Sequence, residues 1–320
     1  MNFSFSQFLD LPSENSPGEF RAIPISLHRR DFIAKGPGGS PIFLLNDSNS
    51  INYYPSINFR NLSVEFNISC SICSDDNELK GDFCIIQFTE NLPELYEIFV
   101  KCMCSAVENL PEITNTQKLE SFILELGELF RTLNAPGRRE ISGLWSELFV
   151  IFISGNPKNA LHSWHNDPYD RFDFSNDRMR LEVKSTVHDI RIHEFSLEQL
   201  VPHVNSNGYI ASVLLKKTSF GCGVFELASK IEEQVKDSSE LKKKLWGNII
   251  KALGSDFSEK LDEYFDIEFA KKEIKIYQMD NIPKPSNSDD ERITNIRFKS
   301  NINELPCGIA TSMLESIFNE

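Results

Sequence analysis

The pattern of hydrophobic and polar positions changes along the chain, and each change predicts a different kind of secondary structure. From Phe20 to about Phe88, short apolar runs alternate with turn-forming clusters, which predicts several strands. Between Ser63 and Ile72, apolar residues occupy every second position, as in a half-buried strand. The glycine cluster at 36–39 lacks the Gly-Lys-Ser/Thr of a phosphate-binding loop and therefore predicts a hairpin turn.

The region from Leu92 to about Ile153 has apolar residues at helical spacing, interrupted by a break at Asn134–Gly137. A further helix is expected after the break, with Ser142 as its N-cap. Its body is apolar nearly all round, which is typical of a buried helix, yet it contains Glu147. A buried glutamate needs a partner, and a metal cluster, a narrow wet stripe or an arginine are the alternatives.

The most informative segment is Tyr169–Thr186, where two alternating runs flank a polar turn. Around Asp173, and again around Glu182 and Lys184, apolar and charged residues alternate as they do in half-buried strands. The polar cluster Ser175–Arg178 predicts the turn between them. With this turn at the centre, Asp173 lies directly opposite Glu182, and both carboxylates share one face of the hairpin.

This grouping suits phosphodiester hydrolysis. Two carboxylates at this spacing suit Mg²⁺, which takes few protein carboxylates and keeps several waters. A metal-bound water loses its proton more easily and can attack a phosphodiester. The lysine two residues beyond the glutamate can orient that water or offset the charge that builds on the phosphate.

The ordered motifs resemble those of the PD-(D/E)XK nuclease superfamily. Within it, the chain is similar to a family of restriction-like nucleases encoded beside phage-defence genes. The closer resemblance covers about residues 141–215 and departs from the superfamily motif at Phe172, which replaces a proline. The matching features are Gly143–Leu148, then Trp164 ahead of Asp173, then Glu182–Lys184, then Phe195–Leu200.

The resemblance implies a metal-dependent DNA endonuclease of restriction-like type, acting in restriction or anti-phage defence. Mg²⁺ is the expected cofactor, with Mn²⁺ as a substitute, through either one or two ions. Lys184 would position the attacking water, and Gln199 would support the metal or a phosphate unless it is ordinary helix surface. The metal ligands implied are Asp173, Glu182, the Val183 carbonyl and Glu147.

Other interpretations of these residues remain open. Asp170 replaces Asp173 as a ligand if the register of the hairpin differs. His162 and His165, with Asp167 or Asp170, would form a transition-metal site, although loop histidines are more often exposed. The Glu182–Lys184 pair would be an accidental surface pair if the hairpin is misread, and such a pair contributes roughly 0–1 kcal/mol.

After the hairpin, the pattern predicts a strand at 191–195, a helix at 197–203 and a strand at 209–215. Helices predominate from about Val224, with two strand-like stretches at Glu273–Met279 and Ile293–Phe298. We predict a mixed α/β (α+β) fold with a restriction-endonuclease-like core, a mixed sheet flanked by helices. The predicted domains are a β-rich N-terminal domain (1–90), the nuclease-like core with leading helices (91–225) and a mainly helical C-terminal region (226–320).

Composition narrows the class of protein. The chain of 320 residues has a net charge of −14, which argues against a nucleic-acid binder. The window from Arg131 to Glu194, however, contains nine Lys/Arg and nine Asp/Glu and is neutral. The seven cysteines include two close pairs. Cys102-x-Cys104 lacks the usual zinc spacing and Cys70 continues the apolar stripe of a strand, so reduced, buried thiols are expected. No membrane-spanning run or signal peptide is recognised, and we expect a cytoplasmic protein.

These observations leave two functional hypotheses. The first is the endonuclease, with DNA as substrate, and with a homodimer or defence-system partner proteins, because a double-strand break needs two active sites. The second is a non-catalytic or partner-dependent DNA-binding subunit that keeps the nuclease fold. The acidic net charge favours the second, whereas the intact set of Asp173, Glu182 and Lys184 favours the first.

Overall fold

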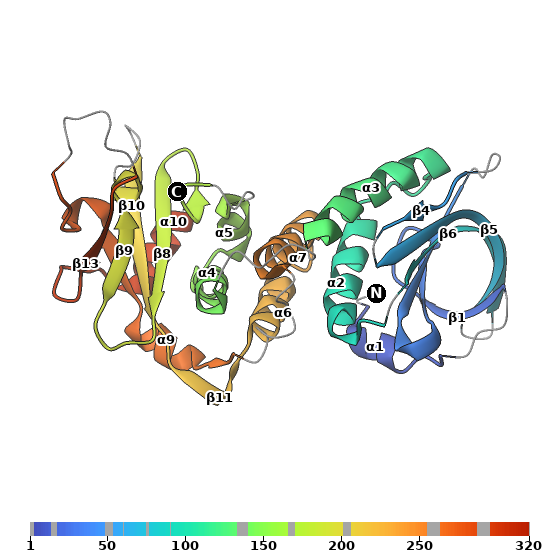
Figure 1. Cartoon of the computed structure of the whole chain (residues 1–320), viewed down its shortest axis with the longest axis horizontal. Coiled ribbons are helices and arrows are strands. Elements are labelled where there is room, and N and C mark those ends of the chain that lie inside the picture. Colours follow the sequence, from blue (N-terminus) through green and yellow to red (C-terminus); the bar gives the residue numbers. More distant parts are fainter. Residues whose placement is uncertain are drawn as a thin grey trace. The chain divides into compact units, whose positions relative to one another are not determined.

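The computed structural model describes residues 3–13, 18–48, 54–59, 61–74, 77–89, 91–132, 140–165, 170–200, 206–254, 263–286 and 295–319. The chain divides into two compact units, Met1–Ala135 and Pro136–Glu320 (Figure 1). The helices between 93 and 132 are thereby grouped with the β-rich region. The division into three domains at 90 and 225 remains a prediction.

The first unit is built around a six-stranded sheet with the order β1-β2-β3-β6-β5-β4. An additional parallel pairing between β1 and β5 closes five of these strands into a ring, and Figure 1 shows the long strands curving around it. The strands expected between Phe20 and Phe88 are therefore present. The strands are β1 (Glu19–Pro24), β2 (Phe32–Lys35), β3 (Pro41–Asn46), β4 (Ile57–Asn58), β5 (Leu62–Ser74) and β6 (Asn77–Phe88).

The glycine cluster forms the turn between β2 and β3, as the sequence predicts. A short 3-10 helix, η1 (Pro37–Gly39), spans it, and the Gly36 N–H donates to the Ser40 carbonyl at 2.7 Å. Gly38 and Gly39 have φ values of 70° and 82°, a backbone region that only glycine adopts readily.

Alternation along β3 distributes its side chains between two layers of the first unit. Ile42 and Leu44 belong to the apolar cluster shared by the strands, whereas Phe43 meets Phe99 of α2 (Pro93–Val107), with ring centroids 5.4 Å apart. The strand is therefore buried on both faces. The remaining helices of this unit are α1 (Phe5–Leu9) and α3 (Thr116–Thr132).

The second unit contains a mixed four-stranded sheet with the order β12-β10-β8-β7. Its members are β7 (Phe174–Ser175), β8 (Met179–Thr186), β10 (Asn207–Leu214) and β12 (Lys275–Gln278), and β8 and β10 run parallel. Helix α4 (Ile141–Ile153) packs against β8. Strand β9 (Ile192–Ser196) pairs with β13 (Arg297–Asn301) in a separate two-stranded sheet that also contacts β8. The mixed α and β content is as predicted.

Several boundaries differ from the expectations. Helix α4 begins at Ile141 with Glu140 as its N-cap, so Ser142 is inside the helix, and its carbonyl accepts from Ser146 Oγ. The helix expected at 197–203 is a 3-10 turn, η2 (Leu197–Leu200), and positions 201–205 lie outside the described residues. The remaining elements are α5 (Pro157–Ser163), β11 (Lys217–Cys222), α6 (Val224–Gln234), α7 (Ser239–Leu253), α9 (Ile267–Glu273), η4 (Met279–Asn281) and α10 (Ala310–Asn319).

Two negative findings apply to the residues that the structure describes. None of the helices there is both long and apolar enough to cross a bilayer. The cysteines are free thiols, and none belongs to a group of metal ligands. Cys70 is buried and Cys73 is exposed.

Candidate active site

The buried face of α4 holds Glu147, the glutamate that the sequence places in an apolar helix. Its side chain is 5 % exposed. Trp164 Nε1 donates to Glu147 Oε2 at 2.8 Å, and His165 Nε2 lies 3.1 Å from the same oxygen. The alternative of a wet stripe on the helix is therefore wrong. A buried carboxylate costs free energy unless partners such as these surround it.

The hairpin has the predicted register. Phe174 pairs with Leu181 and Ser175 with Arg180, which puts the turn where the sequence predicts it and makes Asp173 and Glu182 the next positions across. Strand β7 begins only at Phe174, however, so Asp173 lies just outside the pleated backbone. The Asp173 Oδ2 accepts a hydrogen bond from the Val183 N–H at 2.7 Å. Asp173 thereby satisfies a backbone donor on the edge of β8 at a position that β7 does not reach.

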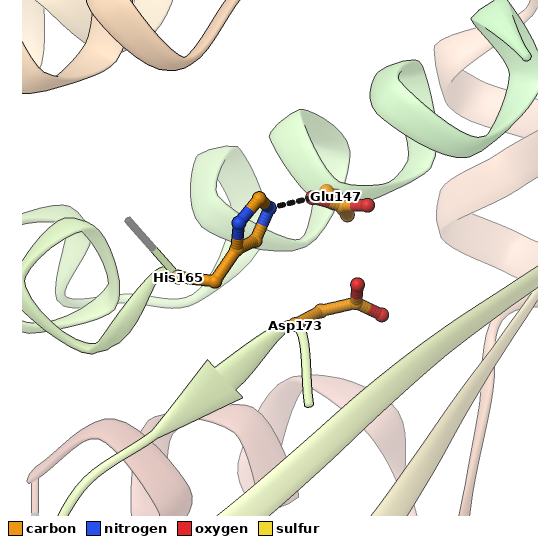
Figure 2. Close-up of side chains that lie close together, drawn as sticks. All are labelled: Glu147, His165 and Asp173. Carbon is orange, nitrogen blue, oxygen red and sulfur yellow. Dashed lines mark hydrogen bonds and ion pairs between the residues drawn. The ribbon is translucent and has the colours of Figure 1, made fainter. Parts of the chain in front are cut away.

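Three side chains from separate segments form a first group, which we call the carboxylate–imidazole cluster: Glu147, His165 and Asp173. One ligand atom from each residue lies within 4.8 Å of the others. Figure 2 shows Glu147 on its helix, His165 after α5 and Asp173 before β7, with the side chains converging. The His165 N–H also donates to the Asp173 carbonyl at 2.9 Å, so the two residues are joined through their backbones.

Glu182, Lys184 and Gln199 form a second group. Glu182 Oε1 lies 2.8 Å from Lys184 Nζ and accepts from Gln199 Nε2 at 2.8 Å. The side chains of Glu182 and Lys184 are 6 % and 20 % exposed, so the interpretation as an accidental surface pair is wrong. Gln199 is likewise not ordinary helix surface, because its amide contacts Glu182.

Val183 links the two groups. Its N–H contacts Asp173, while its neighbours Glu182 and Lys184 contact Gln199 and the ring of Phe195 on the side of β9 and η2. The sequence predicts that Asp173 and Glu182 share one face with Lys184. The structure gathers Asp173 with Glu147 and His165, and the shared face of Asp173 and Glu182 stays a prediction.

The competing candidates separate clearly. Asp170 is exposed, and the structure brings Asp173 rather than Asp170 into the cluster. His162 is exposed, and among the described residues His165 groups with Glu147 and Asp173 instead of His162. Asp167, the other proposed partner, lies outside the described residues. His165 is the site residue that the sequence does not single out, because its contacts with Glu147 and Asn248 come from distant segments.

A buried polar chain lies beside Lys184. Ser212 is the register partner of Lys184 on β10, and its hydroxyl contacts both Arg191 NH1 (2.9 Å) and His193 Nε2 (2.8 Å). Burial, together with the charges of Lys184 and Arg191, lowers the pKa of His193 from 6.5 to about 4. His193 is therefore neutral near pH 7 and accepts or donates one hydrogen bond without adding charge beside Lys184.

Comparison with known proteins gives one match. A family model described as "Putative PD-(D/E)XK family member" (DUF4420) matches residues 9–303. The chain belongs to this PD-(D/E)XK family. The resemblance in the motifs around Glu147, Asp173 and Glu182–Lys184 is thereby confirmed at the level of the family, and membership indicates a nuclease-like function. Searches of curated proteins and of solved structures find no match.

PD-(D/E)XK nucleases generally use divalent metals, and the carboxylate–imidazole cluster fits such an ion. Its residues offer two carboxylates and one imidazole, all at most 9 % exposed. Two buried carboxylates so close to each other repel, and a cation between them would offset that repulsion. The two carboxylates and the imidazole are therefore the ligands expected of a metal site, and they would be unfavourable in an apolar core.

Proposed function

We propose that this PD-(D/E)XK protein is a metal-dependent DNA endonuclease of restriction-like type that serves in restriction or anti-phage defence. The observation that carries the proposal is the adjacency of two groups: the carboxylate–imidazole cluster, and Lys184 held on Glu182. One group offers metal ligands and the other an ammonium, and each can contribute to the hydrolysis of a phosphodiester.

Each side chain of the site has a separate role in the proposed reaction. Glu147 and Asp173 would hold the cation from α4 and from the start of the hairpin, and Glu182 with the Val183 carbonyl would complete the ligand set implied by the motif. A bound divalent ion would acidify a coordinated water and offset charge on the phosphate. Lys184 would orient the attacking water and stabilise the negative charge that develops on the phosphate oxygens. Gln199 is a positioning residue, because it holds Glu182 at 2.8 Å.

The decisive experiment compares cutting of supercoiled plasmid, methylated and unmethylated, by wild type and by Lys184→Ala, with Mg²⁺ or Mn²⁺. Loss of one preorganised charge-stabilising group typically costs about 10²–10³-fold in rate. We expect metal-dependent cutting by wild type and a loss of that size in Lys184→Ala, measured from the rate at which the supercoiled form disappears.

Lys271→Ala is a matched control, because Lys271 also lies 2.9 Å from a glutamate, Glu268, on the surface of α9. It should cut at the wild-type rate. Equal cutting by wild type and Lys184→Ala would place the active site elsewhere in the chain.

A non-catalytic or partner-dependent DNA-binding subunit is the alternative function, and the net charge of −14 favours it. Under this alternative, well-folded wild type binds DNA in a salt-dependent manner and cuts neither plasmid. Cutting that begins only when a second protein or a second copy of the chain is supplied would indicate a partner-dependent enzyme. A double-strand break requires two active sites, so the proposed enzyme works as a homodimer or in a complex.

A further inference from the structure

His165 is built into the site as firmly as the acidic residues. Its side chain is 9 % exposed, and Nε2 lies 3.1 Å from Glu147 Oε2 (Figure 2). The backbone N–H of His165 donates to the Asp173 carbonyl, and the backbone carbonyl of His165 accepts from Asn248 Nδ2 of α7 at 2.6 Å. The backbone of His165 is therefore fixed from both sides before any ligand arrives.

The surroundings of the imidazole are also those of a metal ligand. The Trp164 ring meets the His165 ring edge-on, with centroids 5.6 Å apart, while its Nε1 donates to Glu147. Groups that hold and orient the ligands of a metal ion in this way typically change its affinity 10–100-fold when they are removed. Trp164 thus orients two members of the cluster at once.

The chemistry of the donor set then discriminates between ions. Mg²⁺ binds through oxygen and dehydrates reluctantly, so an imidazole adds little to its affinity. First-row transition metals accept imidazole nitrogen readily, and Mn²⁺ in addition accepts carboxylate and water. A site with two carboxylates and one imidazole therefore favours a transition metal over Mg²⁺.

We propose that His165 binds the metal together with Glu147 and Asp173, and that the site consequently prefers a divalent transition metal such as Mn²⁺ to Mg²⁺. This inference names the class of ion for the proposed nuclease. It rests on the proposed function only where cutting of DNA is concerned, because binding of the metal can be measured without DNA. The competing explanation is that His165 merely holds Glu147 through a hydrogen bond.

His165→Gln separates the two explanations, because its amide N–H can still reach Glu147 while the imidazole nitrogen is lost. Binding of Mn²⁺ is followed by the electron paramagnetic resonance signal of the free ion, and binding of Mg²⁺ by calorimetry, both on the full chain without DNA. We expect the Mn²⁺ Kd to rise at least about tenfold and the Mg²⁺ Kd to stay close to that of wild type. His162→Gln, at the exposed neighbouring histidine, should leave both values unchanged.

Wild type alone provides a second test that needs no variant. Pulsed electron paramagnetic resonance of the bound Mn²⁺ should show coupling to ¹⁴N if an imidazole binds the ion. Absence of that coupling overturns the proposal, as does an unchanged Mn²⁺ Kd in His165→Gln. Equal weakening of both ions overturns it too, because His165 would then be a positioning residue for Glu147.

Lys184→Ala keeps the two proposals distinguishable. It should lose cutting but bind Mn²⁺ as wild type does. Wild type that binds Mn²⁺ with ¹⁴N coupling and cuts no DNA would support the metal site and reject the nuclease.

Discussion

At the scale of single residues, the buried ionisable groups of the second unit differ in how far the sequence identifies them. Glu147 could be recognised from the sequence because a glutamate inside an apolar helix needs a reason. His165 could not, because its burial depends on Asn248 of α7, 83 positions later, and on Glu147 of α4. Local sequence cannot report such contacts between distant segments.

His193 leads to a prediction about stability and pH. Its pKa is lowered to about 4 by burial and by the nearby Lys184 and Arg191, whereas the unfolded chain has the ordinary value of 6.5. The unfolded state therefore binds the proton more readily between these values, and stability falls as the pH drops through this window. The contribution is fully present above about pH 6.5, and roughly 2 kcal/mol of it is lost between pH 7 and pH 5.

Urea unfolding of wild type and His193→Gln at pH 5, 6 and 7.5 measures this effect. The glutamine keeps an amide near Ser212 Oγ but does not titrate. Between pH 7 and pH 5, the free energy of unfolding of His193→Gln should therefore fall by roughly 2 kcal/mol less than that of wild type. His28→Gln, at an exposed histidine, should follow wild type. A pH dependence identical in wild type and His193→Gln would show that His193 is not held neutral.

At the scale of elements, the motif hairpin was predictable and its environment was not. Alternation around Asp173 and Glu182 and the polar turn between them set a register that the pairs Phe174–Leu181 and Ser175–Arg180 confirm. The start of β7 at Phe174 depends instead on tertiary contacts, such as the bridge between Trp164 and Phe174. The pairing of β9 with β13 is equally non-local, so periodicity finds the strands and not their partners.

The closed sheet of the first unit leads to a prediction that concerns a buried ion pair. Arg29 Nε lies 2.6 Å from Asp31 Oδ2, with side chains 2 % and 0 % exposed. Arg29 also donates to the Pro111 carbonyl, and Asp31 accepts from the Asn46 N–H, so the pair ties the segment before β2 to the end of β3 and to the segment after α2. Removing one partner leaves a buried charge alone and typically costs 3–5 kcal/mol.

Asp31→Ala should therefore lower the free energy of unfolding by about 3–5 kcal/mol, measured by urea unfolding. Lys80→Ala is the control, because it breaks an ion pair in which the Lys80 and Glu78 side chains are 77 % and 56 % exposed. That variant should unfold close to wild type. Similar losses in both variants would mean that burial does not set the strength of these pairs.

At the scale of the whole molecule, negative charge is shared unequally between the two units. Met1–Ala135 contains nine Lys/Arg against 18 Asp/Glu, and Pro136–Glu320 contains 24 against 29. The ring-shaped sheet therefore belongs to the more acidic part, and the part with the candidate active site is closer to neutral. An acidic total charge is thus compatible with local binding of DNA by the second unit.

Under the proposed function, this distribution predicts which basic residues would contact DNA. Lys158 and Arg178 are exposed in the second unit, whereas Lys80 is exposed in the first and paired with Glu78. Each phosphate contact releases counterions, so losing one weakens binding to all sequences alike and lowers the salt slope by about 1. Lys158→Ala and Arg178→Ala should each show both effects, and Lys80→Ala should show neither.

The measurement is fluorescence anisotropy of unrelated DNA duplexes titrated with each variant at several salt concentrations, with EDTA present to prevent cutting. The salt slope, which reports the number of phosphate contacts, separates loss of a contact from a general change of net charge. All three variants remove one positive charge, so equal weakening by all of them would mean that only the total charge matters. A slope that falls only for Lys158→Ala and Arg178→Ala would place the DNA on the unit that contains Glu147, Asp173 and Lys184.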